Sequence, residues 1–294
     1  MKKDRISLIA GFTPALCMGI LMGFEYLTEI GALPGGLWMA AAAETAAFLL
    51  PLVILLLIGR TAEGDRPPLR LKGTVPHCRA FVFLLSLATP FGAFLLNYLT
   101  ASLTGAQAGA QGGAAMLLGS GGQSAAGAVV LVAVLLPAVV EELFFRLGLM
   151  GSMESAGTWA AILISALSFA LVHGTAANFA GPLFAGVIFG YMCFALGSVW
   201  PAVFAHLVSN LYAYGIHYFS GVYETFDLWG YFILVNVVCF CIFLYFAMRS
   251  LEKLIERGKI PRFKKSGLER LVFAFLSPGF LLLVLLFCLK TFYL

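Results

Sequence analysis

Charged side chains are scarce in this sequence. Asp, Glu, Lys and Arg make up 11% of its 294 residues, whereas an ordinary soluble domain carries roughly a quarter. Apolar residues make up 61% of the chain. Because so few charges cannot cover a water-exposed surface, the composition excludes an ordinary soluble enzyme or binding domain and predicts an integral membrane protein.

Long polar segments are also few, and apolar runs of the roughly 20 residues that cross a bilayer recur along almost the whole chain. We predict an all-α fold, a polytopic transmembrane helix bundle of about nine spans, with eight also possible. The predicted spans are 6–24, 37–58, 80–101, 127–149, 158–177, 180–197, 199–219, 229–248 and 271–290. We divide the chain into N-terminal transmembrane helices with a flexible outer loop (1–126), a middle part (127–219) and C-terminal transmembrane helices with a basic cytoplasmic loop (220–294).

Lysine and arginine are missing from alternate predicted loops. The loops without either residue are 25–36, 102–126, 178–179 and 220–228. The basic residues gather instead in the N-terminal tail and in 59–79 and 249–270, which share one side if there are nine spans. The positive-inside rule identifies that side, and the N-terminus, as cytoplasmic. The net charge of +4 thus reflects topology and contact with membrane lipid, and we expect no nucleic-acid partner.

Cysteine and histidine motifs of the usual metal sites are absent. None of the six cysteines has metal or redox spacing, and five lie inside predicted spans, where cysteine behaves as a small apolar residue. The sequence also lacks a His-Glu-x-x-His helix, the usual way to bring two zinc ligands and a base together.

Ionisable residues inside the predicted spans are few, and each costs several kcal/mol unless it is paired or faces water. Most of them lie in three neighbouring spans, and this clustering indicates a functional site. We expect Glu44, in the second span, to pair structurally within the bundle or to line a substrate path, and His217 to lie near an interface. The complete set is Glu44, Glu141, Glu142, Arg146, His173, His206 and His217.

The fourth span carries a Glu-Glu-x-x-x-Arg motif. Glu142 and Arg146 are four residues apart with the acid first, so on a helix they can neutralise each other. Glu141 is rotated about 100° away and lacks this partner, which leaves its carboxylate available as a general base. The triplet alone is equally consistent with a structural ion pair that locks helices together.

Two histidine motifs follow on the fifth and seventh spans. Phe169 and His173 share a helix face at i, i+4, and so do His206 and Asn210. Either histidine alone would be typical of a hydrogen-bonded packing residue. Together with the two acids, the set supplies a base, hydrogen-bond donors for an oxyanion and possible metal ligands.

The three motifs in this order resemble those of the CPBP family, the CAAX-processing and bacteriocin-processing (Abi) intramembrane proteases. The resemblance covers about 127–219, which makes this part the predicted catalytic core, in the fourth to seventh spans. It implies an intramembrane endopeptidase in which Glu141 activates water. Glu142 and Arg146 would support the helix that presents Glu141.

The resemblance also assigns roles to the second and third motifs. His173 would lie beside Glu141 and hold the water, with Phe169 supporting its ring. His206 and Asn210 would bind the scissile carbonyl oxygen as negative charge develops on it.

A bound metal would change these assignments. The family is often catalogued as metalloproteases, and Glu141, His173 and His206 would be the ligands if zinc were bound. Because Asn210 suits an oxyanion donor better than a zinc ligand, we favour hydrolysis by glutamate-activated water with no cofactor.

The predicted spans place the site residues at different depths. Glu141 and His206 lie a few residues from the cytoplasmic surface, whereas His173 lies about 15 residues into the fifth span, or roughly 22 Å. A shared site requires the fifth helix to start later, to tilt or to dip toward the cytoplasm.

The motifs do not define the substrate or the oligomeric state. The resemblance allows CAAX-type prenylated or peptide-leader substrates, and the sparse loops favour a prokaryotic plasma membrane. The alternatives are a non-catalytic membrane scaffold or immunity protein and a transporter with a buried proton relay. Transporters often contain inverted repeats, and no internal repeat is evident in this sequence.

Overall fold

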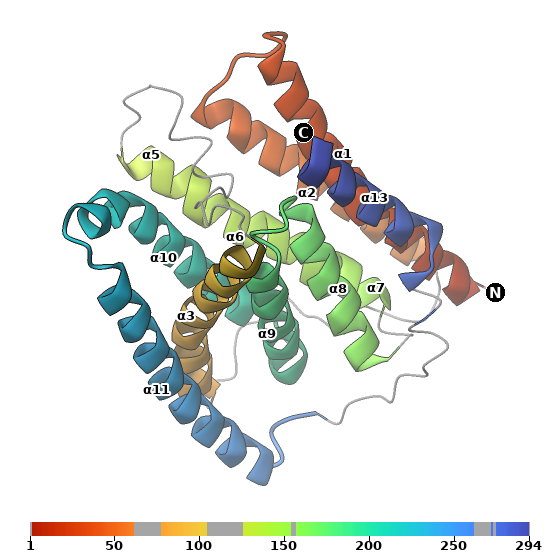
Figure 1. Ribbon diagram of the computed structural model, residues 1–294. Helices are drawn as coiled ribbons and strands as arrows, with labels where there is room; N and C mark the ends of the chain where they lie inside the picture. The colour runs from red at the N-terminus through yellow and green to blue at the C-terminus, as the bar shows by residue number, and fades with distance from the viewer. Residues whose placement is uncertain are drawn as a thin grey trace.

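The computed structural model describes residues 2–61, 78–104, 126–153, 157–261, 272 and 275–293. Within these residues the secondary-structure elements are all helices and include no β-strand (Figure 1). The predicted all-α fold is therefore confirmed for the described part of the chain.

The described elements follow one another along the chain as helices. In chain order they are α1 (Lys2–Glu29), α2 (Leu37–Thr61), α3 (Arg79–Thr104), α5 (Ala126–Val130), η2 (Leu131–Leu135), α6 (Leu136–Glu142), η3 (Leu143–Met150), α7 (Gly151–Met153), α8 (Thr158–Val172), α9 (Ala180–Leu196), α10 (Trp200–Thr225), α11 (Trp229–Glu256) and α13 (Pro278–Tyr293). Each of the nine predicted spans overlaps one of these helices or the continuous run from α5 to α7.

Four helices of the described chain are long and apolar enough to cross a membrane, judged by length and composition. They are Leu37–Leu57, Arg79–Thr104, Gly127–Met153 and Trp229–Glu256. Shorter apolar helices are Thr158–Val172, Ala180–Leu196 and Pro278–Phe292. These helices make the chain an integral membrane protein, while the total of nine crossings stays a prediction.

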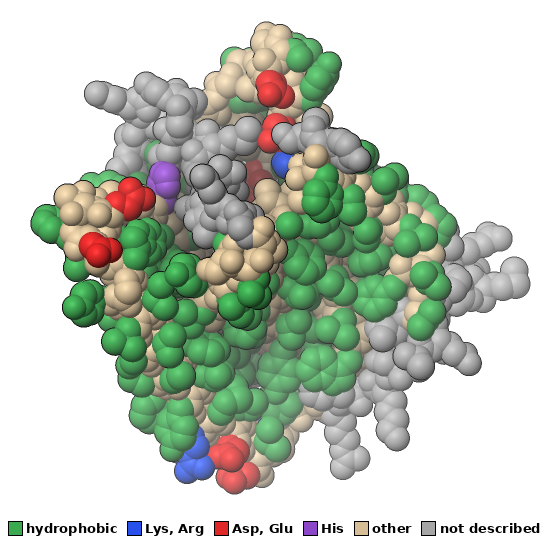
Figure 2. All heavy atoms as spheres, viewed as in Figure 1, with side chains coloured by type: hydrophobic (Ala, Val, Ile, Leu, Met, Phe, Trp, Pro, Cys, Tyr) green, Lys and Arg blue, Asp and Glu red, His purple; other side chains and the backbone are tan. Residues whose placement is uncertain are grey.

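The surface fits this assignment. Figure 2 shows hydrophobic side chains over most of the described face, with charged side chains gathered toward its upper and lower ends. Large apolar side chains such as Val235, Tyr245 and Leu285 are at least half exposed. A surface of this kind is stable against lipid tails and would be costly in water.

The fourth span runs through the interior of the bundle. Its segments from α5 to α7 pack against α2, α8 and α10, and α1 lies beside α13 on one side of the molecule (Figure 1). The segments η2 and η3 are π-helical and flank the short α-helical turns that end at Glu142. Such π-helical turns are often found at functional sites, and no periodicity in the sequence predicted them.

The predicted fifth span, 158–177, is wrong at its C-terminal end. The helix α8 begins at Thr158 as predicted but ends at Val172. Gly174 has a φ of 75°, a left-handed conformation that glycine adopts easily, and its N–H bonds to the Leu171 carbonyl at 3.0 Å. A later helix start therefore does not explain the depth of His173. Instead, α8 has 15 residues, fewer than the roughly 20 needed to cross a bilayer.

The irregular segment after α8 is held by a side chain from α3. Asn97 donates from Nδ2 to Asn178 Oδ1 at 2.7 Å, and its Oδ1 accepts the Gly181 N–H at 2.6 Å. Non-helical backbone at membrane depth requires such internal partners. Asn97 thus fixes the connection that follows His173.

Candidate active site

Glu142 is the centre of the buried polar network. Its Oε2 accepts a hydrogen bond from Arg146 Nε at 2.9 Å, within an ion pair whose side chains are both 0% exposed. Its Oε1 lies 3.1 Å from His206 Nδ1. The i, i+4 pairing was expected from the spacing, whereas the bond to His206, 64 residues away in the chain, was not.

Arg146 is enclosed by partners from three helices. Its Nη1 donates to Ser165 Oγ at 2.6 Å, and Ser165 Oγ in turn donates to the Phe145 carbonyl at 2.9 Å. The guanidinium carbon lies 5.3 to 5.9 Å from the ring centroids of Phe145, Phe169 and Phe189. Hydrogen bonds and cation–π contacts together offset part of the loss of water around this charge, while Nη2 is buried without a hydrogen-bond partner.

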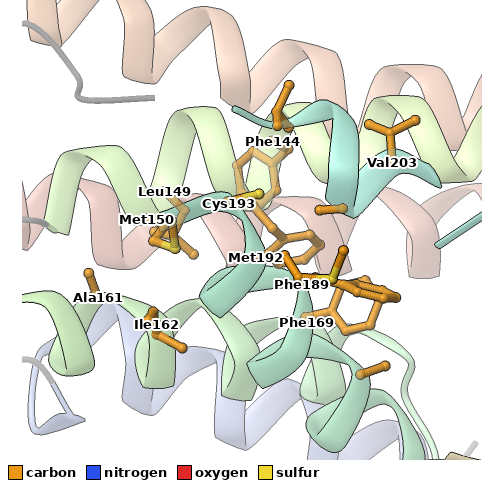
Figure 3. Close-up of a cluster of buried hydrophobic side chains, with 14 of the residues drawn as sticks. Phe144, Leu149, Met150, Ala161, Ile162, Phe169, Phe189, Met192, Cys193 and Val203 are labelled. Atoms are coloured by element: carbon orange, nitrogen blue, oxygen red, sulfur yellow. The ribbon is translucent and has the colours of Figure 1, made fainter. Parts of the chain in front are cut away.

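The rings around Arg146 belong to the apolar core. Figure 3 shows Phe169 of α8 and Phe189 of α9 within a cluster of buried side chains that includes Phe144, Met192 and Cys193. The Phe169 and Phe189 ring centroids are 6.3 Å apart. The polar network is therefore surrounded by tightly packed side chains, which strengthens its electrostatic interactions.

His206 is held by this packing as well as by Glu142. Its ring stacks on Phe189 at 5.4 Å and meets Phe169 edge-on at 5.5 Å. Because Nδ1 faces a carboxylate, Nδ1 carries a hydrogen, and the ring is fixed with Nε2 available for a substrate.

His173 follows the last residue of α8. Its Nδ1 lies 2.8 Å from the Phe169 carbonyl oxygen, so Nδ1 is the donor and Nε2 of the neutral ring is left as an acceptor. The His173 ring packs against Phe169 at 4.6 Å. Phe169 therefore separates the two imidazole rings and orients both. From the resemblance, Phe169 was expected to support the His173 ring alone.

Asn210 lies one turn after His206 on α10. Its Nδ2 donates to the Val134 carbonyl at 3.3 Å, which ties α10 to the π-helical segment η2. An amide group has two N–H donors, so this bond leaves the second one available.

Glu141 lies apart from the ion pair. Its side chain is buried, with 8% of the residue exposed. For Glu44, in the second span, the sequence predicts a structural partner within the bundle or a place along a substrate path. Its Oε1 is buried without a hydrogen-bond partner in the described part of the chain.

The predicted site residues are thus only partly joined by direct bonds. Glu142, Arg146 and His206 are hydrogen-bonded, and Phe169 contacts both histidine rings. Among the described residues, Glu141 and His173 share no hydrogen bond or ion pair. The sequence motifs did not identify Ser165 as a partner of Arg146. Its position four residues before Phe169, on the same face of α8, could have indicated it.

A metal site is not assembled by the described side chains. In the part of the chain that the structure describes, no group of three or more His, Cys, Asp or Glu could hold a metal ion. In the set expected for zinc, Glu141, His173 and His206, each histidine has its Nδ1 bonded to an oxygen, of Glu142 or of a backbone carbonyl, so only Nε2 could bind a metal. Since the described side chains do not bring these three residues together as a metal-holding group, we derive no step through a metal.

Fold and site together define an all-helical integral membrane protein with acidic, basic and histidine side chains in its interior. The comparison with known protein families then specifies the class. Residues 123–212 match the Rce1-like family, described as Type II CAAX prenyl endopeptidase Rce1-like. No curated protein and no solved structure gives a significant match.

This segment is similar to the Rce1-like CAAX prenyl endopeptidases, and the match supports the CPBP/CAAX protease family. The matched residues contain all three motifs, from Glu141 to Asn210. The match bears out the resemblance seen in the sequence and supports a CAAX-type intramembrane protease in general.

Proposed function

We propose that this protein hydrolyses peptide bonds at the membrane by means of a water molecule activated by Glu141. The observation that carries the proposal is the division between two adjacent acids. Glu142 is bonded to Arg146 and His206, whereas Glu141 has no cation as a direct partner among the described residues. Glu141 is therefore the carboxylate free to accept a proton.

Attack on the substrate follows from this assignment. The water oxygen bonds to the scissile carbonyl carbon while one water proton passes to the Glu141 carboxylate. His173 accepts a hydrogen bond from the same water through Nε2, which its bond to the Phe169 carbonyl leaves unprotonated. As the carbon–nitrogen bond breaks, the proton on Glu141 passes to the leaving amine.

The negative charge on the carbonyl oxygen requires donors. His206 would donate from Nε2 in the form of its ring that carries a hydrogen on both nitrogens, with Nδ1 bonded to Glu142. Asn210 offers the N–H that is not bonded to Val134. Loss of one such donor typically lowers kcat by about 100- to 1,000-fold.

The substrates we propose are CAAX-type prenylated peptides, with peptide leaders as the second class. The family description of residues 123–212 supports the first class. The large apolar side chains exposed on α11 and α10 are consistent with a substrate that arrives through lipid. We further propose a cytoplasmic N-terminus, as the distribution of basic residues indicates, in a prokaryotic plasma membrane, which the sparse loops favour.

A panel of quenched-fluorescent peptides tests this proposal. Purified wild-type protein, Glu141→Ala and Glu252→Ala are compared on prenylated CAAX-type and leader-like peptides, with and without a chelator. Glu252 lies on the exposed part of α11 and is the matched control for loss of an acid. We expect cleavage by wild type and Glu252→Ala, none by Glu141→Ala, and no effect of the chelator.

Two results would contradict parts of the proposal. Equal cleavage by wild type and Glu141→Ala would exclude Glu141 as the base. Chelator-sensitive cleavage that zinc restores would show that water is activated by a metal.

A further inference from the structure

Lys290 of α13 and Glu25 of α1 form an ion pair that the proposed mechanism does not use. Lys290 Nζ donates to Glu25 Oε2 at 2.6 Å, and the two side chains are 25% and 33% exposed. Both residues lie outside the segment 123–212 that matches the family. Because an ion pair as exposed as this contributes little stability by itself, holding α1 to α13 is not a sufficient role for it.

The helices α1 and α13 already pack closely at a distance from this pair (Figure 1). A Cβ atom on Gly279, near the start of α13, would lie 2.4 Å from the Gly11 carbonyl carbon of α1. The two backbones are therefore in direct contact there, which glycine allows. Lys290 lies about three turns further along α13. What the ion pair adds at that point is a fixed direction for the Lys290 side chain.

The Lys290 side chain lies over Gly174, the residue that follows His173. A Cβ atom on Gly174 would lie 2.8 Å from Lys290 Cδ and 3.1 Å from Lys290 Cε. The next residue of α13, Thr291, donates from its hydroxyl to the Gly174 carbonyl at 3.4 Å. Because Gly174 has no side chain, two consecutive residues of α13 reach its buried backbone directly.

His173 depends on this contact because α8 ends one residue before it. In the described part of the chain, its ring is held by a hydrogen bond to the Phe169 carbonyl and by packing on the Phe169 ring. Both interactions come from the preceding turn of α8. The backbone on the other side of His173 is held by α13 at Gly174 and, further on, by Asn97 of α3.

We propose that Lys290, held in place by Glu25, is a positioning residue that fixes the His173 imidazole by packing against Gly174. Lys290 makes no contact with the reacting atoms, and its effect passes through the backbone from Gly174 to His173. The inference rests on the proposed function, in which His173 holds the attacking water. Through this contact α1 and α13 take part in building the site.

Three variants separate this role from a general effect on packing. Lys290→Ala removes the side chain over Gly174, Lys290→Arg keeps a long cationic side chain, and Glu25→Gln removes the opposite charge. Lys253→Ala is the matched control, because Lys253 is an exposed lysine in the last turn of α11. The full-length proteins are assayed in detergent on a quenched-fluorescent prenylated CAAX-type peptide, and thermal unfolding reports folding.

We expect Lys290→Ala to lower kcat by roughly 10- to 100-fold with KM unchanged, since misplacing a catalytic group by about 1 Å can cost about 100-fold. Glu25→Gln should lower kcat in the same way but by less. Lys290→Arg should keep most of the wild-type kcat, and Lys253→Ala should match wild type. Equal loss of kcat in Lys290→Arg and Lys290→Ala would overturn the role.

A double-mutant cycle shows whether the effect passes through His173. Once His173→Ala has removed the imidazole, Lys290→Ala should lower kcat little further, because both changes affect one interaction. The same loss with and without His173 would mean that Lys290 acts on packing in general, and would overturn the role. If His173→Ala has no measurable activity, the comparison of Lys290→Arg with Lys290→Ala decides.

Hydrogen exchange tests the contact without an activity assay. The backbone amides of 173–181 should exchange faster in Lys290→Ala than in Lys253→Ala, because the segment loses a partner from α13. Equal exchange in the two variants would overturn the inference.

The outcomes distinguish this inference from the proposed function. Wild-type kcat in Lys290→Ala and Glu25→Gln, beside an inactive Glu141→Ala, would overturn only the role of Lys290. Activity of Glu141→Ala equal to wild type would overturn the proposed function itself. If Lys290→Ala does not fold, Glu25→Gln decides alone: a lower kcat with unchanged KM supports the role, and a wild-type kcat overturns it.

Discussion

The fourth span and α11 look alike by hydropathy and differ in almost everything else. Both have a mean hydropathy of 2.4 in their most apolar stretch. In that stretch 56% of the fourth span is buried, compared with 11% of α11. One helix is surrounded by protein and the other faces mainly outward, where lipid would lie.

The two helices also carry matching ion pairs in opposite environments. Glu142 and Arg146 are both 0% exposed, whereas Arg249 and Glu252 on α11 are each 60% exposed. Buried charges depend on their partners, and exposed ones can rely on water. The comparison shows that burial, and not hydropathy, distinguishes the helix that carries chemistry from the helix that faces the bilayer.

The largest expected effect comes from breaking the buried pair. Arg146→Met keeps an unbranched side chain but leaves Glu142 without its cation. We expect the free energy of unfolding to fall by about 3–5 kcal/mol, the typical cost of an uncompensated buried charge. Arg249→Met is the matched control and should change it by no more than about 1 kcal/mol. Denaturation in detergent measures both, and equal effects would remove the distinction between the two helices.

Ser165→Ala tests the second partner of Arg146. The substitution removes the acceptor of the Nη1 bond and should cost about 1.5–3 kcal/mol, as for hydrogen bonds to charged groups. Ser209→Ala is the control, because the Ser209 hydroxyl donates to the Ala205 carbonyl of its own helix at 2.9 Å and its loss should be nearly neutral. A Ser165→Ala protein as stable as wild type would mean that the Arg146 charge does not depend on this bond.

Glycine substitutions give the smallest effect and test packing directly. A Cβ atom on Gly186 of α9 would lie 3.0 Å from the Ala166 Cα of α8, whereas one on Gly230 of α11 would meet nothing within 4 Å. Gly186→Ala should therefore destabilise the protein by about 1–3 kcal/mol, and Gly230→Ala should not. Melting temperatures of the two variants in detergent check this, and a stable Gly186→Ala protein would show that α8 and α9 can separate.

Apolar runs and helical spacing predicted much of this protein. Because a helix in lipid must satisfy its own backbone, runs of about 20 apolar residues define helices well. The i, i+4 rule likewise placed Glu142 beside Arg146 and Phe169 beside His173. These predictions depend on neighbours within one helix, where sequence distance fixes spatial distance.

The parts that could not be predicted depend on contacts between helices. The bonds from Glu142 to His206 and from Arg146 to Ser165 follow from how helices pack, which spacing within one helix does not encode. The early end of α8 depends on the backbone conformation of Gly174. The substrate, the catalytic roles and the number of membrane crossings stay predictions.

The most direct test of the account compares Glu141→Gln with Glu142→Gln, because the central claim is that adjacent acids divide catalysis and structure. Peptide cleavage and thermal unfolding are measured on the same preparations. Glu141→Gln should lose at least about 100-fold in kcat, as for a general base, with an unchanged melting temperature, whereas Glu142→Gln should unfold at a lower temperature. Wild-type cleavage by Glu141→Gln would contradict the claim.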